Sequence, residues 1–303
     1  MRGLVRQSSD LSLLYGTSVE LAVGSLETPK SLLDATRDIE IVYHVAAKVN
    51  DWGPLKSFRQ VNVYGTKNLL DAAIQNEVKT FVYVSSVAVH SFIGSQNMNE
   101  QSPQLPTHFP YCRSKREAET LVREYHNNNK IVVTIVRPGD VYGPGDRTFL
   151  LKIGRMLEEG RMVLIGSGNW LGAFVYVENL ANGLILAGTL NKAAGRTYII
   201  TDGIKLTWRE YFERLTSALG VSRSMISVNT TIAYSIAFGL ELIYSLLRIR
   251  RRPPLTRYIV ARMSKDFCFN IDKAKRDLKY VPDTDIDKAI EKTAEWYKKE
   301  VRK

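Results

Sequence analysis

Tyr111 and Lys115 could together transfer a proton to or from an alcohol or ketone oxygen. Residues four apart lie on one face of a helix, so the phenol and the ammonium would be neighbours. A free tyrosine titrates at about pH 10, and a fixed positive charge close to it favours the phenolate at neutral pH. Ser85 and Ser86 end a preceding apolar run and add hydroxyl groups to the same predicted site.

Strands and helices that alternate along the chain would position these residues. Short β-branched runs alternate with helix-length amphipathic segments through the first two-thirds of the chain, which is typical of a parallel sheet with helices on both faces. The predicted strands there are 3–6, 19–24, 39–46, 80–85 and 131–137, and the helices are 55–75 and 111–127. Later helices are predicted at 147–159, 178–190, 207–219, 230–249 and 284–299, with short strands at 163–165, 174–177 and 196–201.

The pattern predicts an α/β protein with a doubly wound parallel sheet. We expect a sheet core at 1–145 and a smaller cap, interwoven with it, mostly at 146–303, with 173–201 returning to the core. A chain of 303 residues, 45% hydrophobic and 24% charged, can bury such a core.

Composition excludes several classes of function. The net charge of +11 is dispersed, without a basic stripe interleaved with aromatics, so nucleic-acid binding is not expected. Cys112 and Cys268 lack metal-ligand spacing, so we expect neither a disulfide nor a metal site. The apolar run within 1–6 is too short for a signal peptide, and we predict a cytoplasmic protein.

Five motifs follow one another along the chain: Val42 to Ala47, Asn62 to Thr66, Val84 to Ser86, Tyr111 to Lys115 and Arg137 to Pro144. Their order and spacing resemble the extended short-chain dehydrogenase/reductase superfamily. Within it, Ala46 to Pro54 and the late segments Pro253 to Thr256 and Asn270 to Ala274 look most like the 3β-hydroxysteroid dehydrogenase branch, which also includes dihydroflavonol-reductase-like and 2-alkyl-3-oxoalkanoate reductases.

The resemblance implies a role for each catalytic residue. Tyr111 would be the general acid/base, and Lys115 would lower its pKa and hold the nicotinamide ribose. Ser86 would hydrogen-bond the substrate oxygen, with Ser85 as the neighbour that could replace it. Hydride transfer itself belongs to the cofactor. The resemblance implies that the core at 1–145 binds the dinucleotide and that the cap at 146–303 binds the substrate.

The resemblance also implies a set of cofactor contacts. Ala46 and Ala47 would line the cofactor, Asn62 would brace the strand-end backbone, and Pro138 to Val141 would face the carboxamide. The full predicted cofactor-binding set is Arg6, Leu26, Ala46, Ala47, Lys48, Asn62, Ser85, Tyr111, Lys115, Pro138 and Val141. His44 is predicted to be a core histidine instead.

One family feature is missing from the sequence. The family begins with a strand, a Gly-x-x-Gly-x-x-Gly turn and a helix whose amides hold the pyrophosphate, whereas Gly3 and Gly16 are isolated here. Segment 2–6 instead resembles the family's second strand, so about thirty residues would be absent and the sheet would lack its first, central strand. Truncation or divergence would explain this, and we expect the chain as written to bind dinucleotide poorly.

The predicted cofactor is NADP or NAD. Arg6, followed by Ser8 and Ser9, lies where a guanidinium can meet a 2′-phosphate, which favours NADP. Ser25, between Gly24 and Leu26, stands where the family usually has an aspartate that holds the adenine amino group, so this contact to adenine is not expected.

We predict an oxidoreductase that interconverts a secondary alcohol and a ketone on a lipophilic, sterol-like or β-keto substrate. A sugar-nucleotide epimerase is the alternative, but Gly172 stands where epimerases carry an arginine, and Val87 and Ala88 replace the dehydratase acid pair. An inactive, truncated dinucleotide-fold remnant is an alternative of another class.

Two partners besides the substrate are predicted. The apolar segment 230–249, which has Arg248 near its end and is followed by Arg250, Arg251 and Arg252, could lie on a membrane surface or cover the substrate pocket. Glu241 within it, for which we expect no partner, opposes a membrane span. The family likeness implies a homodimer through the helices at 55–75 and 111–127.

Overall fold

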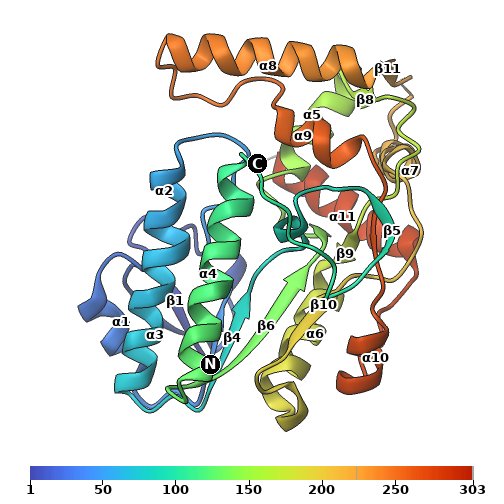
Figure 1. The fold of residues 1–303 in the computed structure, drawn as a ribbon. Coiled ribbons are helices and arrows are strands. Elements are labelled where there is room, and N and C mark those ends of the chain that lie inside the picture. The colour runs from blue at the N-terminus through green and yellow to red at the C-terminus, as the bar shows by residue number, and fades with distance from the viewer. Residues whose placement is uncertain (223, 302–303) are drawn as a thin grey trace. The chain divides into compact units, whose positions relative to one another are not determined.

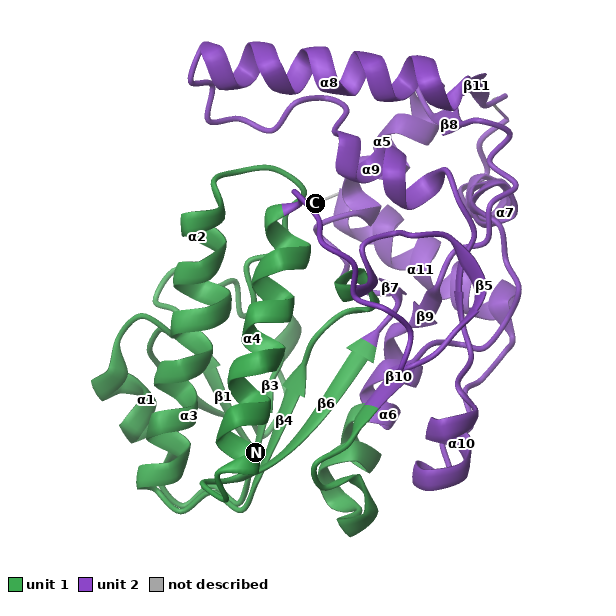
Figure 2. Ribbon diagram, viewed as in Figure 1, with its two compact units in different colours: residues 1–89, 110–137, 184–197 green, residues 90–109, 138–183, 198–303 purple. Residues whose placement is uncertain are grey.

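The computed structural model describes residues 1–222 and 224–301, which form two compact units (Figures 1 and 2). The first unit comprises 1–89, 110–137 and 184–197, and the second comprises 90–109, 138–183 and the described chain from 198 onward. This division by contacts does not test the predicted functional domains, 1–145 and 146–303, which stay a prediction.

Parallel strands form the centre of the first unit. β3 (Ile41–His44), β4 (Thr80–Val84) and β6 (Val132–Pro138) pair side by side in that order, whereas β1 (Arg2–Val5) and β2 (Glu20–Val23) form a separate parallel pair. The five predicted strands and the parallel α/β fold are therefore confirmed. The parallel sheet of this unit is in two pieces, β1–β2 and β3–β4–β6.

Helices cover one side of these strands. They are α1 (Pro29–Thr36), α2 (Leu55–Arg59), α3 (Gly65–Gln75) and α4 (Pro110–Asn127). Their apolar faces form one buried core cluster together with the strands. Members of this cluster include Leu32, Leu69, Leu70, Val42, Phe81, Tyr83 and Tyr125. The predicted continuous helix at 55–75 is interrupted by a π-helical segment, Gln60–Tyr64, which joins α2 to α3.

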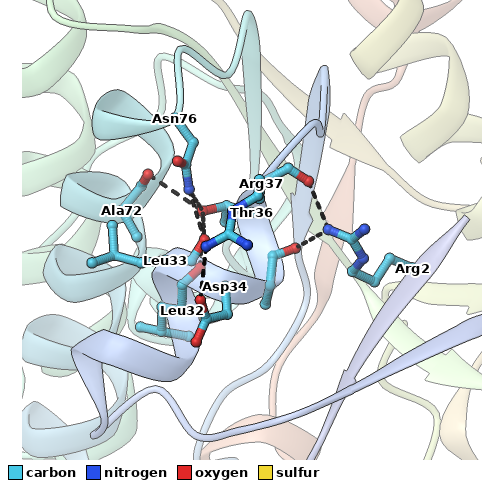
Figure 3. Close-up of polar contacts among 9 residues, drawn as sticks. Arg2, Leu32, Leu33, Asp34, Thr36, Arg37, Ala72 and Asn76 are labelled. Atoms are coloured by element: carbon cyan, nitrogen blue, oxygen red, sulfur yellow. Dashed lines mark hydrogen bonds and ion pairs between the residues drawn. The ribbon is translucent and has the colours of Figure 1, made fainter.

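Side-chain hydrogen bonds join α1 to β1 and to α3 (Figure 3). Arg2 of β1 donates to the carbonyl oxygens of Ala35 and Arg37 at the end of α1, at 3.2 and 2.7 Å. Asn76, at the end of α3, donates to the hydroxyl of Thr36 at 2.8 Å, and that hydroxyl donates to Ala72 of α3 at 3.3 Å. The β1–β2 pair is thus attached to the rest of the unit through α1.

The other face of these strands carries exposed apolar side chains. Leu21 and Val23 of β2 are 41% and 66% exposed, and Val45, just after β3, is 56% exposed. Parallel sheets are normally covered on both faces. The two-piece sheet therefore leaves apolar surface uncovered in the first unit.

The second unit holds shorter strands and a larger aromatic core. Its strands pair in parallel as β5 (Ser95–Met98) with β12 (Phe267–Phe269), β7 (Asp140–Tyr142) with β9 (Phe174–Tyr176), and β8 (Val163–Ile165) with β11 (Ile226–Val228). Its helices are α5 (Leu150–Glu158), α7 (Trp208–Leu219), α8 (Thr230–Leu246), α9 (Arg257–Met263), α10 (Asp272–Leu278) and α11 (Ile286–Val301). α6 (Val177–Thr189) and β10 (Thr197–Ile200) contribute residues to both units.

The core of the second unit forms where α5, α7 and α11 pack together. Trp208, Tyr211 and Phe212 of α7 are buried there with Tyr297 of α11. A capping box, in which the Thr207 side chain accepts from the backbone of Glu210 and the Glu210 side chain accepts from the backbone of Thr207, begins α7. The helices predicted at 147–159, 207–219 and 284–299 are confirmed.

The expectation that Glu241 would have no partner is wrong. Both carboxylate oxygens accept from Arg257 at the start of α9, one from the backbone amide at 2.8 Å and one from the guanidinium Nε at 2.6 Å. The charge is therefore buried as a hydrogen-bonded pair, which offsets the cost of removing it from water.

Candidate active site

Helix α4 places three ionisable residues on one buried face. Pro110 begins the helix, where its fixed φ and missing N–H are tolerated. Tyr111, Lys115 and Glu119 follow at intervals of four, and their exposed fractions are 8%, 2% and 2%. The predicted neighbours Tyr111 and Lys115 are therefore both buried.

Lys115 joins α4 to the end of β4. Its Nζ donates to the carbonyl oxygen of Val84 at 2.7 Å and lies 4.4 Å from the centre of the Tyr83 ring. Burial lowers the pKa of Lys115 to about 7, against the opposing charge of Glu119, which raises it. The ammonium is therefore placed beside the strand end that leads directly into Ser85 and Ser86.

The two serines follow β4 without a break. Ser85 is buried, and its amide donates to the carbonyl oxygen of Val136 on β6 at 2.7 Å. Ser86 is half-buried, and its hydroxyl accepts from the amide of Ala88 at 3.1 Å in the short 3-10 turn Val87–His90. The structure thus brings the predicted catalytic residues to two adjoining elements, although their roles stay proposals.

A buried ion pair beside this site was missed from the sequence. Glu119 accepts two hydrogen bonds from Arg137 of β6, from Nε at 2.8 Å and from an outer nitrogen at 2.6 Å. Burial raises the pKa of Glu119, but the hydrogen bond and charge of Arg137 outweigh it and hold the pKa below its ordinary value. The sequence does signal the buried position of Glu119, since it continues the four-residue spacing of Tyr111 and Lys115, but it does not signal Arg137 as the partner.

Asn62 braces the loop after β3. Its side-chain oxygen accepts from the amide of Lys48 at 2.7 Å, and its nitrogen donates to the Lys48 carbonyl at 3.1 Å and to the Ser114 hydroxyl of α4 at 3.0 Å. Asn62 lies within the π-helical segment, a local geometry frequent at functional sites. The ammonium of Lys48 in turn donates to Ser57 at 3.0 Å.

His44 is a core histidine, as predicted. Its Nε2 lies 2.8 Å from the hydroxyl of Thr66, and its side chain is buried beside the rings of Phe81 and Tyr83. Burial, with a smaller contribution from the charge of Lys115, lowers the pKa of His44 to about 3. It is therefore neutral at physiological pH and suited to packing.

The remaining predicted cofactor positions are spread over both units. Arg6 is exposed in a turn that ends β1, and Leu26 is buried in the core with its carbonyl accepting from Asn68 at 2.9 Å. Ala46 is exposed and Ala47 half-buried in the loop after β3. The other two positions lie in the second unit, Pro138 buried and Val141 39% exposed.

These residues fit one half of a dinucleotide better than the other. The buried ammonium of Lys115, the phenol of Tyr111 and the loop held by Asn62 suit a ribose and a nicotinamide ring. The glycine turn that would hold a pyrophosphate has no counterpart in the sequence, and β1 ends in the turn at Arg6. The pyrophosphate half therefore lacks the cradle that its charge requires.

A parallel α/β fold with a buried Tyr–Lys helix face beside a strand-end serine defines a dehydrogenase/reductase of the extended short-chain type. Residues 6–229 match the model of the 3-beta hydroxysteroid dehydrogenase/isomerase family, and the chain belongs to that family. The family resemblance and the NAD(P)-dependent enzyme class predicted from the sequence are confirmed.

The similar proteins include several activities. The 2-alkyl-3-oxoalkanoate reductase of Stenotrophomonas maltophilia is 29% identical over 88% of this chain and 83% of that protein. The crystal structure of gox2253 is 28% identical, with a TM-score of 0.79 over 99% of this chain and 91% of that one. UDP-glucuronic acid 4-epimerase from Bacillus cereus, in complex with UDP-glucuronic acid and NAD, is 22% identical with a TM-score of 0.73 over 95% and 84%, a likeness of fold alone.

The buried pair of Glu119 should matter far more to stability than an exposed pair on the same helix. We expect Glu119→Gln to lower the free energy of unfolding by about 3 kcal/mol, because it leaves the Arg137 charge buried without its counter-ion. Glu117, whose half-exposed carboxylate accepts from Arg59 at 2.7 Å, is the matched control. Glu117→Gln should cost about 1 kcal/mol or less by urea unfolding, and equal losses would contradict the assignment.

The lowered pKa of Lys115 should appear as a dependence of stability on pH. The folded protein binds this proton less tightly than the unfolded chain, so folding is penalised below about pH 7 and the penalty falls as the pH rises toward the unfolded pKa. Relative to Lys115→Met, the wild type should gain up to about 1.4 kcal/mol per pH unit between pH 7.5 and 9.5. The exposed Lys56→Met variant should follow the wild type; a Lys115→Met profile parallel to wild type would refute the shift.

Proposed function

We propose that this protein interconverts a secondary alcohol and a ketone on a lipophilic, sterol-like or β-keto substrate. The observation that carries the proposal is the hydrogen bond from Lys115 to Val84, which holds the Tyr111 face of α4 against the strand end that leads to Ser86. Membership of the 3-beta hydroxysteroid dehydrogenase/isomerase family supports it.

Each residue has a defined task in this reaction. A bound nicotinamide would supply the hydride chemistry. The hydroxyl of Ser86 would hold the substrate oxygen, and the phenol of Tyr111 would give or accept the proton at that oxygen. The ammonium of Lys115 would stabilise the phenolate charge of Tyr111, and its loss would leave the proton donor in its ordinary, weakly acidic state.

Local packing favours this reaction over epimerisation of a sugar nucleotide. Gly172 stands where epimerases carry an arginine, and a side chain there would meet the ring of Phe174, since a Cβ would lie 2.4 Å from its Cε2. Val87 and Ala88, in the dehydratase acid-pair positions, are 2% and 4% exposed and apolar. The epimerase alternative would need a different source of phosphate-binding charge.

An inactive dinucleotide-fold remnant is the alternative of another class. The missing glycine turn and the two-piece sheet favour it, whereas the intact Ser86, Tyr111 and Lys115 favour an enzyme. Measurement of turnover with a millimolar dinucleotide decides between them, because weak cofactor binding would then no longer conceal the chemistry.

Removal of the phenol should abolish turnover without unfolding the protein. With a panel of a 2-alkyl-3-oxo acid, a 3β-hydroxysteroid and a UDP-sugar, we expect the apolar ketone or alcohol to react, and Tyr111→Phe to lower kcat on the order of 100-fold or more. Tyr64→Phe, on an exposed tyrosine of the π-helical segment, is the matched control and should keep wild-type kcat. Turnover of the UDP-sugar alone, or full activity of Tyr111→Phe, would overturn the proposal.

The cofactor preference is proposed to be NADP over NAD, because the exposed guanidinium of Arg6 can meet a 2′-phosphate at the end of β1. Calorimetric titration of residues 1–303 should give dissociation constants weaker than micromolar for both dinucleotides, since no glycine turn holds the pyrophosphate. Arg6→Ala should weaken NADPH binding on the order of 10-fold and leave NADH unchanged. Micromolar binding, or an equal effect on both dinucleotides, would contradict this account.

The predicted homodimer through 55–75 and 111–127, the cytoplasmic localisation and the membrane contact through 230–252 also stay proposals. Within the described residues, no helix is both long and apolar enough to cross a bilayer. The membrane contact has further structural support in the exposure of α8.

A further inference from the structure

Helix α8 displays a continuous apolar surface to solvent. Six large side chains, each between 48% and 72% exposed, define what we term the α8 apolar face: Ile232, Ile236, Phe238, Leu242, Ile243 and Leu246. Scattered apolar residues are ordinary on protein surfaces, but a contiguous set marks an interaction site. Figure 2 shows α8 as a long helix at the margin of the second unit.

The opposite side of α8 is fixed to the second unit. Ala233 and Ala237 are buried in its aromatic core, and Glu241 continues the same line at an interval of four. The two hydrogen bonds from Arg257 to Glu241 hold the helix on α9, and the Arg257 guanidinium lies 5.1 Å from the centre of the Phe238 ring. The helix therefore cannot turn its apolar face inward without breaking a buried ion pair.

A cluster of cations follows the helix directly. Arg248, Arg250 and Arg251 are exposed in the first residues after α8, where the backbone turns at Arg248 with φ of 52°. An amphipathic helix with arginines beside its apolar face matches the surface of a bilayer that contains acidic phospholipids. The apolar face would contact the acyl chains, and the arginines would contact the anionic headgroups.

We propose that the α8 apolar face and the three arginines form a docking surface for an anionic phospholipid bilayer, with α8 lying in the plane of the interface. The helix has 17 residues and carries the buried, paired Glu241 on the side opposite its apolar face, so it would rest on the membrane rather than cross it. The three arginines require a negatively charged partner. Anionic phospholipid headgroups carry that charge, whereas an uncharged apolar protein surface does not.

Sedimentation with vesicles tests the proposal on residues 1–303. Vesicles of phosphatidylcholine with about 30% phosphatidylserine should carry the protein into the pellet, and vesicles of phosphatidylcholine alone should carry much less. Because exposed charges are screened by ions, raising the salt concentration should release part of the bound protein.

Two triple variants separate the apolar contribution to membrane binding from the electrostatic contribution. Ile232→Ser/Ile236→Ser/Ile243→Ser should lower partitioning on the order of 100-fold, and Arg248→Gln/Arg250→Gln/Arg251→Gln should do so by a similar factor on anionic vesicles only. The matched controls are Val281→Ser, at an 83% exposed apolar residue, and Lys275→Gln/Lys288→Gln/Lys299→Gln, which removes the same charge elsewhere in the second unit. Both controls should bind as the wild type does.

Three outcomes would overturn the proposal. The first is no binding to anionic vesicles, and the second is equal loss in the lysine control, which would mean that net charge alone drives binding. The third is a concentration-dependent dimer in analytical ultracentrifugation that the isoleucine variant abolishes and that persists with lipid, which would make a second copy the occupant. Since the substituted residues are exposed, circular dichroism should show unchanged helix content in both triple variants.

Discussion

The hydrogen bond from Lys115 to the carbonyl of Val84 is the contact on which the candidate active site depends. A buried lysine loses much of its hydration, so its ammonium must find partners in the protein. The Val84 carbonyl and the ring of Tyr83 provide them at the end of β4. Tyr111 lies one helical turn before Lys115 on the same buried face, and the Glu119–Arg137 pair one turn after Lys115 joins α4 to β6.

The two-piece sheet is the second constraint on function. β1 and β2 are attached through α1 and α3 by Arg2, Thr36 and Asn76 rather than by hydrogen bonds to β3, and they leave apolar side chains such as Val23 uncovered. The residues that we propose to handle the proton lie on α4 and at the end of β4, which belongs to the β3–β4–β6 piece. Arg6, which we propose to contact the cofactor, follows β1 in the other piece.

The sequence predicted the elements with strong periodicity and the residues with family motifs. The strands at 80–85 and 131–137 and the helix carrying Tyr111 were foreseen, because burial on both faces gives a strand a continuous apolar run. The short strands β8, β9 and β10 were also predicted, from their β-branched and aromatic residues, whereas β5, β7, β11 and β12 were not. Long-range partners were also beyond reach: nothing local shows that Glu119 pairs with Arg137, that Arg257 neutralises Glu241, or that a π-helical segment would place Asn62 beside Lys48.

A crystal structure of the chain soaked with millimolar NADPH tests the central claim most directly. The account predicts that the nicotinamide ring lies against Tyr111 and Ser86, with the ribose hydroxyls within hydrogen-bonding distance of Lys115 and the pyrophosphate weakly ordered. A nicotinamide bound away from α4, or Tyr111 and Ser86 directed toward separate surfaces with Lys115 far from the ribose, would contradict it.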